Sequence, residues 1–275
     1  MSVNKNNIID SEQQKRLMLD MLRFVDNICR KNGIKYSLIG GSLIGAIRHH
    51  GFIPWDDDLD IILTRDNYNK LKKILDAENG RYQTLKYDEG GRCFCFIKLI
   101  DKQTQLIEGA AQKLNPNYGV YIDVLQYCYM PNTLNKREKY YRTIKLLESI
   151  IGRRKLDFKG MNVRRNVIRL GKNIFSVILG YKTINKMFDK ILNYCDKSEY
   201  VVSNWPAYGF EKEVQLRKNT EKYIDVEFED MKAMVFENYD EILRTTFGNY
   251  MELPPKQKQI PKHNIRAWWK EDYEE

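Results

Sequence analysis

Residues 40–60 read GGSLIGAIRHHGFIPWDDDLD, a glycine turn and a short apolar segment followed by clustered aspartates. The apolar run 34–39 predicts a buried strand that Gly40 and Gly41 end, and Ser42 is a natural N-cap for a helix over 43–47. Backbone N–H groups at such a helix start favour an anion such as phosphate. Carboxylate oxygens are the ligands that hard divalent cations take. The stretch therefore predicts a phosphate site beside a metal site, a combination typical of phosphoryl or nucleotidyl transfer.

The aspartates lie at the start of a second predicted strand, over residues 59–63. Because strand side chains alternate between the two faces, Asp58 and Asp60 project to the same side and can share a cation. Asp56 and Asp57 lie in the loop that enters the strand, where their positions are less fixed. The alternative is a solvated acidic turn, but the Gly-Gly-Ser before the aspartates and the apolar strand after them favour a metal site.

A third carboxylate is expected from elsewhere in the chain, because two rarely complete a metal site for phosphate chemistry. Asp123 is the best candidate, since it is the one charge in the apolar run 119–125 and a lone buried charge is costly unless it is paired or bound to metal. The alternative is an aspartate at the rim of a sheet. Glu108 and Asp101 are weaker candidates. Lys98 is a candidate phosphate ligand, although a lysine in a strand is more often an edge residue.

Together these motifs resemble the signature of the LicD/fukutin-type phosphotransferase family. The resemblance rests on Gly40 to Ser42, Gly45 to His49, Gly51 to Asp60, Asp123 in its strand, and the Phe-Gly-x-Tyr-Met-x-Leu-Pro-Pro stretch from Phe247 to Pro255. It spans about residues 17–263 and departs from the family at Phe247, often a tyrosine, and at 256–258, often acidic. It implies a mixed α/β fold, with a nucleotidyltransferase-like sheet core flanked by helices, in one catalytic domain over 1–275.

The resemblance also implies an activity, the transfer of an alcohol phosphate, phosphocholine first, from a CDP-activated donor to a sugar hydroxyl of a surface glycan. Lipopolysaccharide, teichoic acid and capsule are the expected acceptors. Asp58, Asp60 and Asp123 would bind Mg²⁺ or Mn²⁺ as CMP leaves, with Asp123 completing the metal site or accepting the proton of the acceptor hydroxyl. The implied donor-phosphate ligands are Gly40, Gly41, Ser42, Arg48 and Lys98.

Two other functions remain open on the residues alone. The same site would serve a nucleotidyltransferase that acts on a small molecule or sugar and releases pyrophosphate. A non-catalytic basic protein that binds a membrane or nucleic acid is the other alternative, which the intact Gly-Gly-Ser and Asp-x-Asp motifs disfavour.

The transferred group is a further question. A quaternary ammonium prefers an aromatic cage, and Trp205, Tyr208 and Phe210 are close enough in sequence to form one. Such aromatic clusters are more often part of a core. Phosphoribitol, phosphoglycerol and phosphoethanolamine would suit the same metal site, so the residues leave the alcohol open.

The rest of the chain reads as helices and one hairpin. Residues 11–31 predict an amphipathic helix, with a capping box formed by Ser11 and Gln14 and a stop at Gly33. A helix is also predicted over 66–78, a helical insertion over 134–200, a hairpin near 226–236 and a helix near 238–246.

Composition indicates where the protein works. The chain of 275 residues is 43% hydrophobic, which is enough for a folded core. The polar N-terminus and the absence of an apolar run of about 20 residues predict neither a signal peptide nor a membrane span. Five cysteines, without a Cys-x-x-Cys pair, suggest free thiols in a reducing cytoplasm.

Positive charge is concentrated in residues 151–182, where nine Lys or Arg and one Asp supply +8 of the formal net charge of +9. On a helical wheel Arg165, Arg169 and Lys172 lie opposite a broad apolar face, and Arg164 borders it. The apolar face comprises Val163, Val167, Leu170, Ile174, Phe175, Val177 and Ile178. Such a helix either contacts an anionic membrane or packs on the core with a solvated basic face. Nucleic acid is not expected as a partner, because no nucleic-acid-binding motif accompanies the charge. The expected location is cytoplasmic, peripheral at the inner face of the cell membrane.

Overall fold

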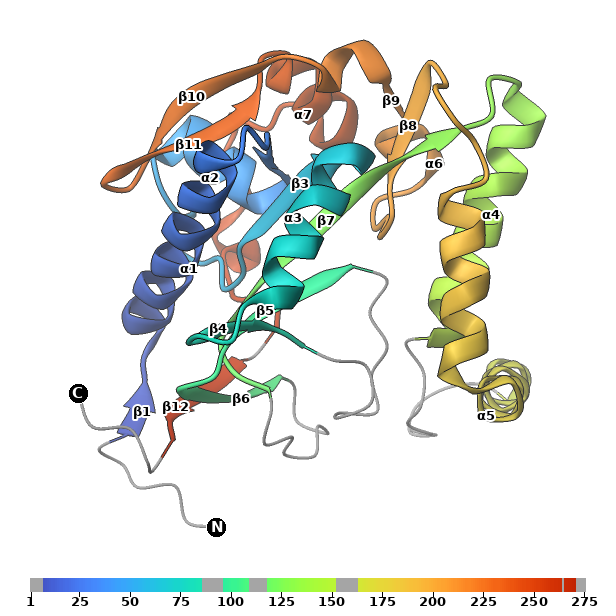
Figure 1. Ribbon diagram of the computed structural model, residues 1–275, viewed down its shortest axis with the longest axis horizontal. Coiled ribbons are helices and arrows are strands. Elements are labelled where there is room, and N and C mark those ends of the chain that lie inside the picture. Colours follow the sequence, from blue (N-terminus) through green and yellow to red (C-terminus); the bar gives the residue numbers. More distant parts are fainter. Residues whose placement is uncertain (1–6, 86–95, 109–117, 152–162, 264, 271–275) are drawn as a thin grey trace. The chain divides into compact units, whose positions relative to one another are not determined.

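Figure 1 shows the computed structural model, which describes residues 7–85, 96–108, 118–151, 163–263 and 265–270. The chain divides into two compact units. Unit 1 comprises Met1–Leu85, Ile97–Gln126 and Lys218–Glu275, and unit 2 comprises Lys86–Phe96 and Tyr127–Arg217. The predicted mixed α/β fold is confirmed, because strands and helices alternate along unit 1.

The central sheet of unit 1 has the strand order β2-β3-β7-β5-β4. These strands are β2 (Ser37–Leu38), β3 (Asp60–Thr64), β7 (Tyr121–Met130), β5 (Ile97–Asp101) and β4 (Tyr82–Thr84). Strands β5 and β7 are antiparallel, and their register places Lys98 opposite Asp123. Because β7 lies between β3 and β5, Asp123 is on an inner strand rather than at the rim.

Two smaller antiparallel arrangements complete the strands of unit 1. One sheet joins β1 (Ile8–Ile9), β12 (Ile265–Trp269) and β6 (Thr104–Glu108), so that the two ends of the described chain pair with each other. The other is the hairpin of β10 (Tyr223–Phe228) and β11 (Met231–Phe236), which confirms the predicted hairpin.

The helices of unit 1 are α1 (Ser11–Lys31), α2 (Gly40–His49), α3 (Arg65–Ala77) and α7 (Tyr239–Phe247), with a 3₁₀ turn, η3, at Lys256–Lys258. The predicted bounds of α1 are confirmed, and Gly33 follows it with a positive φ of 63°. Its predicted capping box was one residue out of place. Asp10 caps the helix by accepting a hydrogen bond from the Gln13 backbone at 2.8 Å, and the Gln13 side chain accepts one from the Asp10 backbone at 3.1 Å.

Unit 2 is built on α4 (Leu134–Ile151) and α5 (Val163–Leu192). Its strand β8 (Tyr200–Ser203) pairs with the second half of β7 and with β9 (Gln215–Leu216). A short helix, α6 (Phe210–Glu213), precedes β9, and the 3₁₀ turn η2 (Arg217–Thr220) follows it. The core includes Tyr140, Ile144, Ile184, Phe188 and Val202.

Helix α5 has two parts that run in different directions (Figure 1), because Gly180 has non-helical angles, with φ 68° and ψ 158°. In the first part Val167, Ile168, Leu170, Ile174 and Ile178 are exposed. The side chains of Arg164, Arg165 and Arg169 lie outside the described residues, as do those of Val163, Phe175 and Val177. Lys172 donates a hydrogen bond from Nζ to Ser149 Oγ of α4, at 2.8 Å.

No helix in the described part of the chain is both long and apolar enough to span a bilayer.

Candidate active site

Helix α2 begins at the glycine turn, three residues earlier than predicted. Gly40 has a φ of 61°, a conformation that favours glycine, and the chain passes directly from β2 into the helix. Ile39 is the N-cap and gives no side-chain cap. Ser42, the predicted cap, is instead buried, and its Oγ accepts a hydrogen bond from the Asp60 backbone N–H at 2.9 Å. The first turn of α2 is therefore tied to the start of β3.

Asp56 lies directly against this helix start. A Cβ atom on Gly41 would lie 2.2 Å from Asp56 Oδ2, so only glycine leaves room for the carboxylate. The sequence left Asp56 loosely placed in a loop, but the residue is buried. The first N–H groups of a helix have no partner within the helix and carry partial positive charge. The structure therefore brings the predicted phosphate-binding turn and the acidic cluster side by side.

Four carboxylates of this cluster act on one another. Burial, followed by the charge of Asp58, raises the pKa of Asp56 to about 7. Burial also raises the pKa of Asp60 well above its usual range, with Asp58 and then Asp123 as the largest charge effects. Like charges that share a site disfavour ionisation unless a cation neutralises them. Asp58 is thus close enough to Asp60 for its charge to act there, although it precedes β3 and does not lie on the strand, and their sharing of a cation stays a prediction.

Asp123 belongs to the cluster, because its charge raises the pKa of Asp60, and it pairs with Lys98. The Lys98 Nζ lies 2.6 Å from Asp123 Oδ1 and 3.2 Å from the centre of the Tyr121 ring. Burial raises the pKa of Asp123 despite the opposing charge of Lys98. The Asp123 side chain is 19% exposed and that of Lys98 is 4% exposed. Strand β5 lies between β7 and β4, so Lys98 is not an edge lysine. It partly neutralises the carboxylate that the sequence proposed as third metal ligand.

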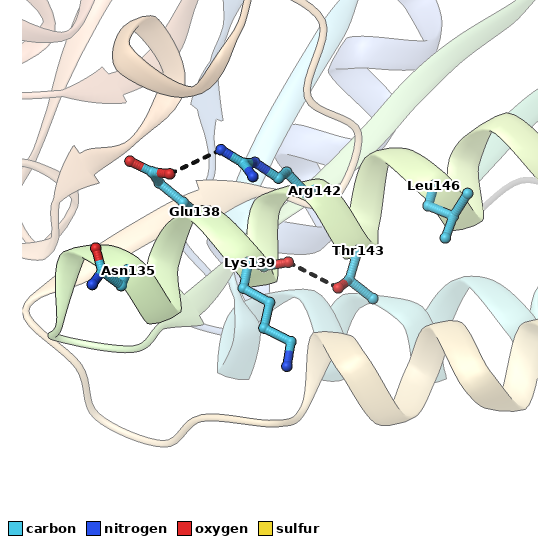
Figure 2. A pocket seen from close by; sticks show the side chains of 6 residues that line it. All are labelled: Asn135, Glu138, Lys139, Arg142, Thr143 and Leu146. Atoms are coloured by element: carbon cyan, nitrogen blue, oxygen red, sulfur yellow. Dashed lines mark hydrogen bonds and ion pairs between the residues drawn. The ribbon is translucent and has the colours of Figure 1, made fainter.

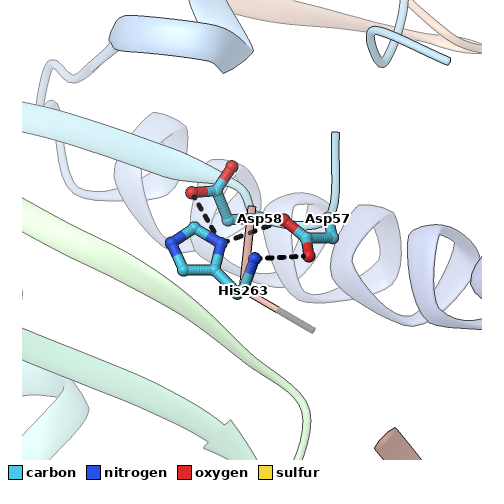
Figure 3. A group of neighbouring side chains, drawn as sticks. All are labelled: Asp57, Asp58 and His263. Atoms are coloured by element: carbon cyan, nitrogen blue, oxygen red, sulfur yellow. Dashed lines mark hydrogen bonds and ion pairs between the residues drawn. The ribbon is translucent and has the colours of Figure 1, made fainter. Parts of the chain in front are cut away.

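His263 belongs to this site as well, and the sequence analysis missed it. Its Nδ1 lies 2.9 Å from Asp57 Oδ1, and its backbone N–H donates to Asp57 Oδ2 at 3.0 Å. Figure 3 shows the imidazole facing both Asp57 and Asp58, whose Oδ2 is 3.7 Å from Nδ1. The hydrogen bond to Asp57 raises the pKa of His263 to about 9. In its protonated form the ring pairs with carboxylates and has no lone pair for a metal.

Comparison with known proteins decides the family. Residues 33–163 match the family model described as the LicD/FKTN/FKRP nucleotidyltransferase domain. The chain is 30% identical over 267 residues to the lipopolysaccharide cholinephosphotransferase LicD of Haemophilus influenzae, covering 93% of this chain and 97% of that protein. The chain belongs to the LicD family. The predicted resemblance is confirmed, and the matched domain contains the glycine turn, the aspartate run and Asp123.

A second relative of this LicD-family protein is known by a shorter match. The human ribitol 5-phosphate transferase FKRP is 35% identical over 65 residues, which is 24% of this chain and 13% of that protein.

The residues of the LicD-family site fit a hard divalent cation. Asp56, Asp58, Asp60 and Asp123 offer carboxylate oxygens, the donor type that Mg²⁺ and Mn²⁺ take. Burial and neighbouring negative charge raise the pKa of Asp56, Asp60 and Asp123, and Lys98 opposes this only in part at Asp60 and Asp123. Asp57 and His263 also meet within 4.8 Å of Asp58. Asp57 and His263 already pair with each other, through both Asp57 oxygens.

The other predicted site residues of this LicD-family chain have partners of their own, and among them Glu108 also lies close enough to the acidic cluster for its charge to raise the pKa of Asp123 and His263. Arg48 NH1 donates to the backbone oxygens of Tyr250, at 2.6 Å, and Glu252, at 3.1 Å. Its guanidinium therefore fixes the segment after α7, and a contact with donor phosphate stays a prediction. Asp101, a weaker candidate, pairs with Arg81 at 2.7 Å. Glu108 accepts a hydrogen bond from the Tyr118 hydroxyl at 3.0 Å.

The proposed cage residues belong to unit 2. The Trp205 ring contacts Phe96 with centres 5.3 Å apart, and the Phe210 ring contacts Tyr141 at 5.6 Å. Tyr208 is exposed. A shallow hollow in unit 2 is lined by α4 alone, through Asn135, Glu138, Lys139, Arg142, Thr143 and Leu146 (Figure 2). None of the predicted site residues lines it.

Proposed function

We propose that this protein is a phosphotransferase that moves phosphocholine from CDP-choline to a sugar hydroxyl of a surface glycan, with Mg²⁺ in the site and CMP as the leaving group. The observation that carries the proposal is the match over nearly the whole length of both chains to a protein named as a lipopolysaccharide cholinephosphotransferase. The shorter match to a ribitol 5-phosphate transferase supports the wider class, transfer of an alcohol phosphate.

The metal would be held by Asp58, Asp60 and Asp123, with Asp56 as a fourth carboxylate. When bound, Mg²⁺ neutralises charge on the donor pyrophosphate and on the departing CMP. Mn²⁺ would serve in the same site. The chain's own part is to keep these carboxylates in place before the donor arrives. Ser42 fixes the start of β3 through the Asp60 backbone, and Lys98 fixes Asp123 from the neighbouring strand.

Phosphate recognition falls to the first turn of α2. The N–H groups of Gly40, Gly41 and Ser42 are at the positive end of the helix dipole, which suits a phosphate oxygen. Lys98 and Arg48 are further candidates for donor phosphate. In addition, Asp123 could accept the proton of the attacking hydroxyl, a role for a carboxylate of raised pKa. Trp205, Tyr208 and Phe210 remain candidates for a choline cage.

The protein's location is a separate proposal, namely the cytoplasmic face of the membrane, where a lipid-linked glycan acceptor would be presented. It is supported by the first part of α5, whose exposed apolar residues Val167, Leu170, Ile174 and Ile178 come from the face that the sequence assigned. Basic residues of the same helix would meet anionic lipid headgroups. Arg164, Arg165, Arg169 and Lys172 are the expected contacts.

A donor screen tests the function. The purified protein is given CDP-choline, CDP-ribitol, CDP-glycerol or CDP-ethanolamine with lipopolysaccharide or teichoic acid acceptors, and CMP is measured with and without EDTA. We expect the fastest metal-dependent release of CMP from CDP-choline. Release of pyrophosphate from nucleoside triphosphates, with no CMP from any of the four donors, would instead show an ordinary nucleotidyltransferase.

A further inference from the structure

His263 is held in the site by a segment far from it in sequence. It lies between η3 and β12, and β12 is fixed by pairing with β6 and β1. Both oxygens of the Asp57 carboxylate accept N–H groups of this one residue, Nδ1 at 2.9 Å and the backbone nitrogen at 3.0 Å. Two hydrogen bonds to an ionised acceptor fix the orientation of the carboxylate as well as its place.

The loop that carries the aspartates is held from its other side by α1. Gln14 donates from its side chain to the Asp57 backbone oxygen at 2.9 Å, and Lys15 donates to the Pro54 oxygen at 2.8 Å. Asp57 is therefore fixed through its main chain by α1 and through its side chain by His263. Asp56 and Asp58, its two neighbours, both belong to the acidic cluster, in which the charge of Asp58 raises the pKa of Asp56 and Asp60.

Without the His263 side chain, the Asp57 carboxylate would keep only backbone N–H groups, those of His263 and Lys262, as hydrogen-bond partners among the contacts described. It would lose the side-chain donor at Oδ1 while Asp56 and Asp58 lie next to it, and like charges so close repel. The loop would then relax away from the geometry that a cation requires. Residues that orient metal ligands without binding the metal commonly change its affinity or the activity by about 10- to 100-fold when replaced.

We propose that His263 is a positioning residue of the active site, which clamps Asp57 through Nδ1 and its backbone N–H and so presents Asp56 and Asp58 to the metal. This inference rests on the proposed metal-dependent function. It assigns no contact between His263 and the metal or the substrate.

Two substitutions separate this role from others. The side-chain nitrogen of asparagine lies about where Nδ1 of histidine does, whereas that of glutamine reaches the place of Nε2. His263→Asn therefore keeps a donor for Asp57, and His263→Gln moves it. Lys258→Gln, an exposed change in the same segment, is the control. Mn²⁺ affinity is measured by electron paramagnetic resonance on the protein alone, with the Tm and the kcat and KM for CMP release.

We expect His263→Gln to weaken Mn²⁺ binding and lower kcat by ~10-fold or more, with little change in the KM for the donor and a Tm close to that of the wild type. His263→Asn should stay within ~3-fold of the wild type in both quantities, because it restores the donor at Nδ1. The Lys258→Gln control should match the wild type.

Three results would overturn the proposal. One is wild-type Mn²⁺ affinity in both histidine variants. Another is wild-type Mn²⁺ affinity and kcat in His263→Gln but not in His263→Asn, which would mean that Nε2 itself acts on metal or substrate. The third is Mn²⁺ binding that weakens only in variants whose Tm also falls, because the loss would then reflect unfolding. If the wild type binds Mn²⁺ but releases no CMP from any donor, the proposed function fails while the comparison of affinities still decides the role of His263. If the wild type binds no Mn²⁺, both fail.

Discussion

The charge of Asp58 raises the pKa of three other carboxylates of the site, Asp56, Asp60 and Asp123. We expect Asp58→Ala and Asp60→Ala each to lower the rate of CMP release by ~10²- to 10⁴-fold, since a metal-bound charge stabiliser is lost. The fold should survive. In Asp60→Ala, for example, the backbone N–H of residue 60 can still donate to Ser42 Oγ. Circular dichroism and a CMP assay measure the two quantities.

A matched control for these variants is Asp76→Ala, which removes an exposed aspartate of α3 that pairs only with surface partners, Lys72 and Thr84, among the contacts described. It should keep wild-type activity. Wild-type rates in Asp58→Ala and Asp60→Ala after EDTA treatment would show that the carboxylates hold no catalytic metal.

Two roles are proposed for Asp123, metal ligand and acceptor of the hydroxyl proton, and one substitution separates them. An amide in its place keeps the size but carries no charge, so Asp123→Asn should raise the Mg²⁺ concentration needed for half-maximal activity as well as lower the rate. Kinetic titration with Mg²⁺ measures both. A lower rate at unchanged Mg²⁺ dependence would make Asp123 a proton acceptor alone, and wild-type kinetics would make its pairing with Lys98 purely structural.

Gly41 is the glycine at which the helix start and the acidic cluster meet. Alanine there would put Cβ 2.2 Å from Asp56 Oδ2, so the carboxylate or the helix start must move. A misplacement of about 1 Å can cost ~100-fold in rate, and we expect Gly41→Ala to lose activity on this scale. Gly80→Ala is the control, since its Cβ would meet nothing within 4 Å. Equal rates in the two variants would contradict the role of Gly41.

At the scale of elements, the first part of α5 combines exposed apolar side chains with a basic sequence. Each Lys or Arg near an anionic surface contributes about 1 kcal/mol. We expect the wild type to sediment with anionic liposomes, to bind neutral ones weakly, and to dissociate in 1 M salt, where the Debye length is ~3 Å. Replacing Arg164, Arg165, Arg169 and Lys172 with Gln should reduce sedimentation, and should reduce activity on a lipid-linked acceptor more than on a soluble sugar.

The control for this variant removes the same charge elsewhere, with Lys70, Lys73, Lys256 and Lys258 replaced by Gln. All four are exposed on α3 or η3. If the α5 variant binds anionic liposomes as well as the wild type does, the basic face is only solvated and the membrane proposal fails.

For the molecule as a whole, the burial and neighbouring charges that raise the pKa of Asp56 and Asp60 oppose folding, and the proposed cation would relieve that cost. A ligand that binds only the native state stabilises it by about 2.7 kcal/mol at a concentration 100 times its Kd. We therefore expect saturating Mg²⁺ to raise the Tm by several degrees over the value in EDTA, measured by calorimetry. The shift should vanish in the double variant Asp58→Ala with Asp60→Ala. The same shift in that variant would locate the bound metal elsewhere.

The features that could be predicted from the sequence are those that depend on neighbouring residues. The spacing of apolar residues determined α1 to the residue, and local pattern determined the β10–β11 hairpin. The glycine turn followed by an acidic run was enough to predict a phosphate site beside a metal site, and its resemblance to a family led to the mixed α/β fold. These signals are local, since a helix period, a turn and a motif are each complete within a few residues.

The partner of each polar group in the site could not be predicted, because it depends on how distant segments pack together. Asp56 lies against Gly41, whereas Asp57 lies against His263. Spacing could not predict this difference, because three consecutive aspartates in a loop have no periodicity that assigns them to faces. Ser42 was predicted as an N-cap from its residue type, but the helix starts earlier, at Gly40. The Ser42 hydroxyl instead accepts a hydrogen bond from the Asp60 backbone N–H. Lys98 meets Asp123 through the register of two strands. His263 reaches Asp57 across a separation of 206 residues, and only the packing of strand β12 in its sheet brings so distant a residue to the site.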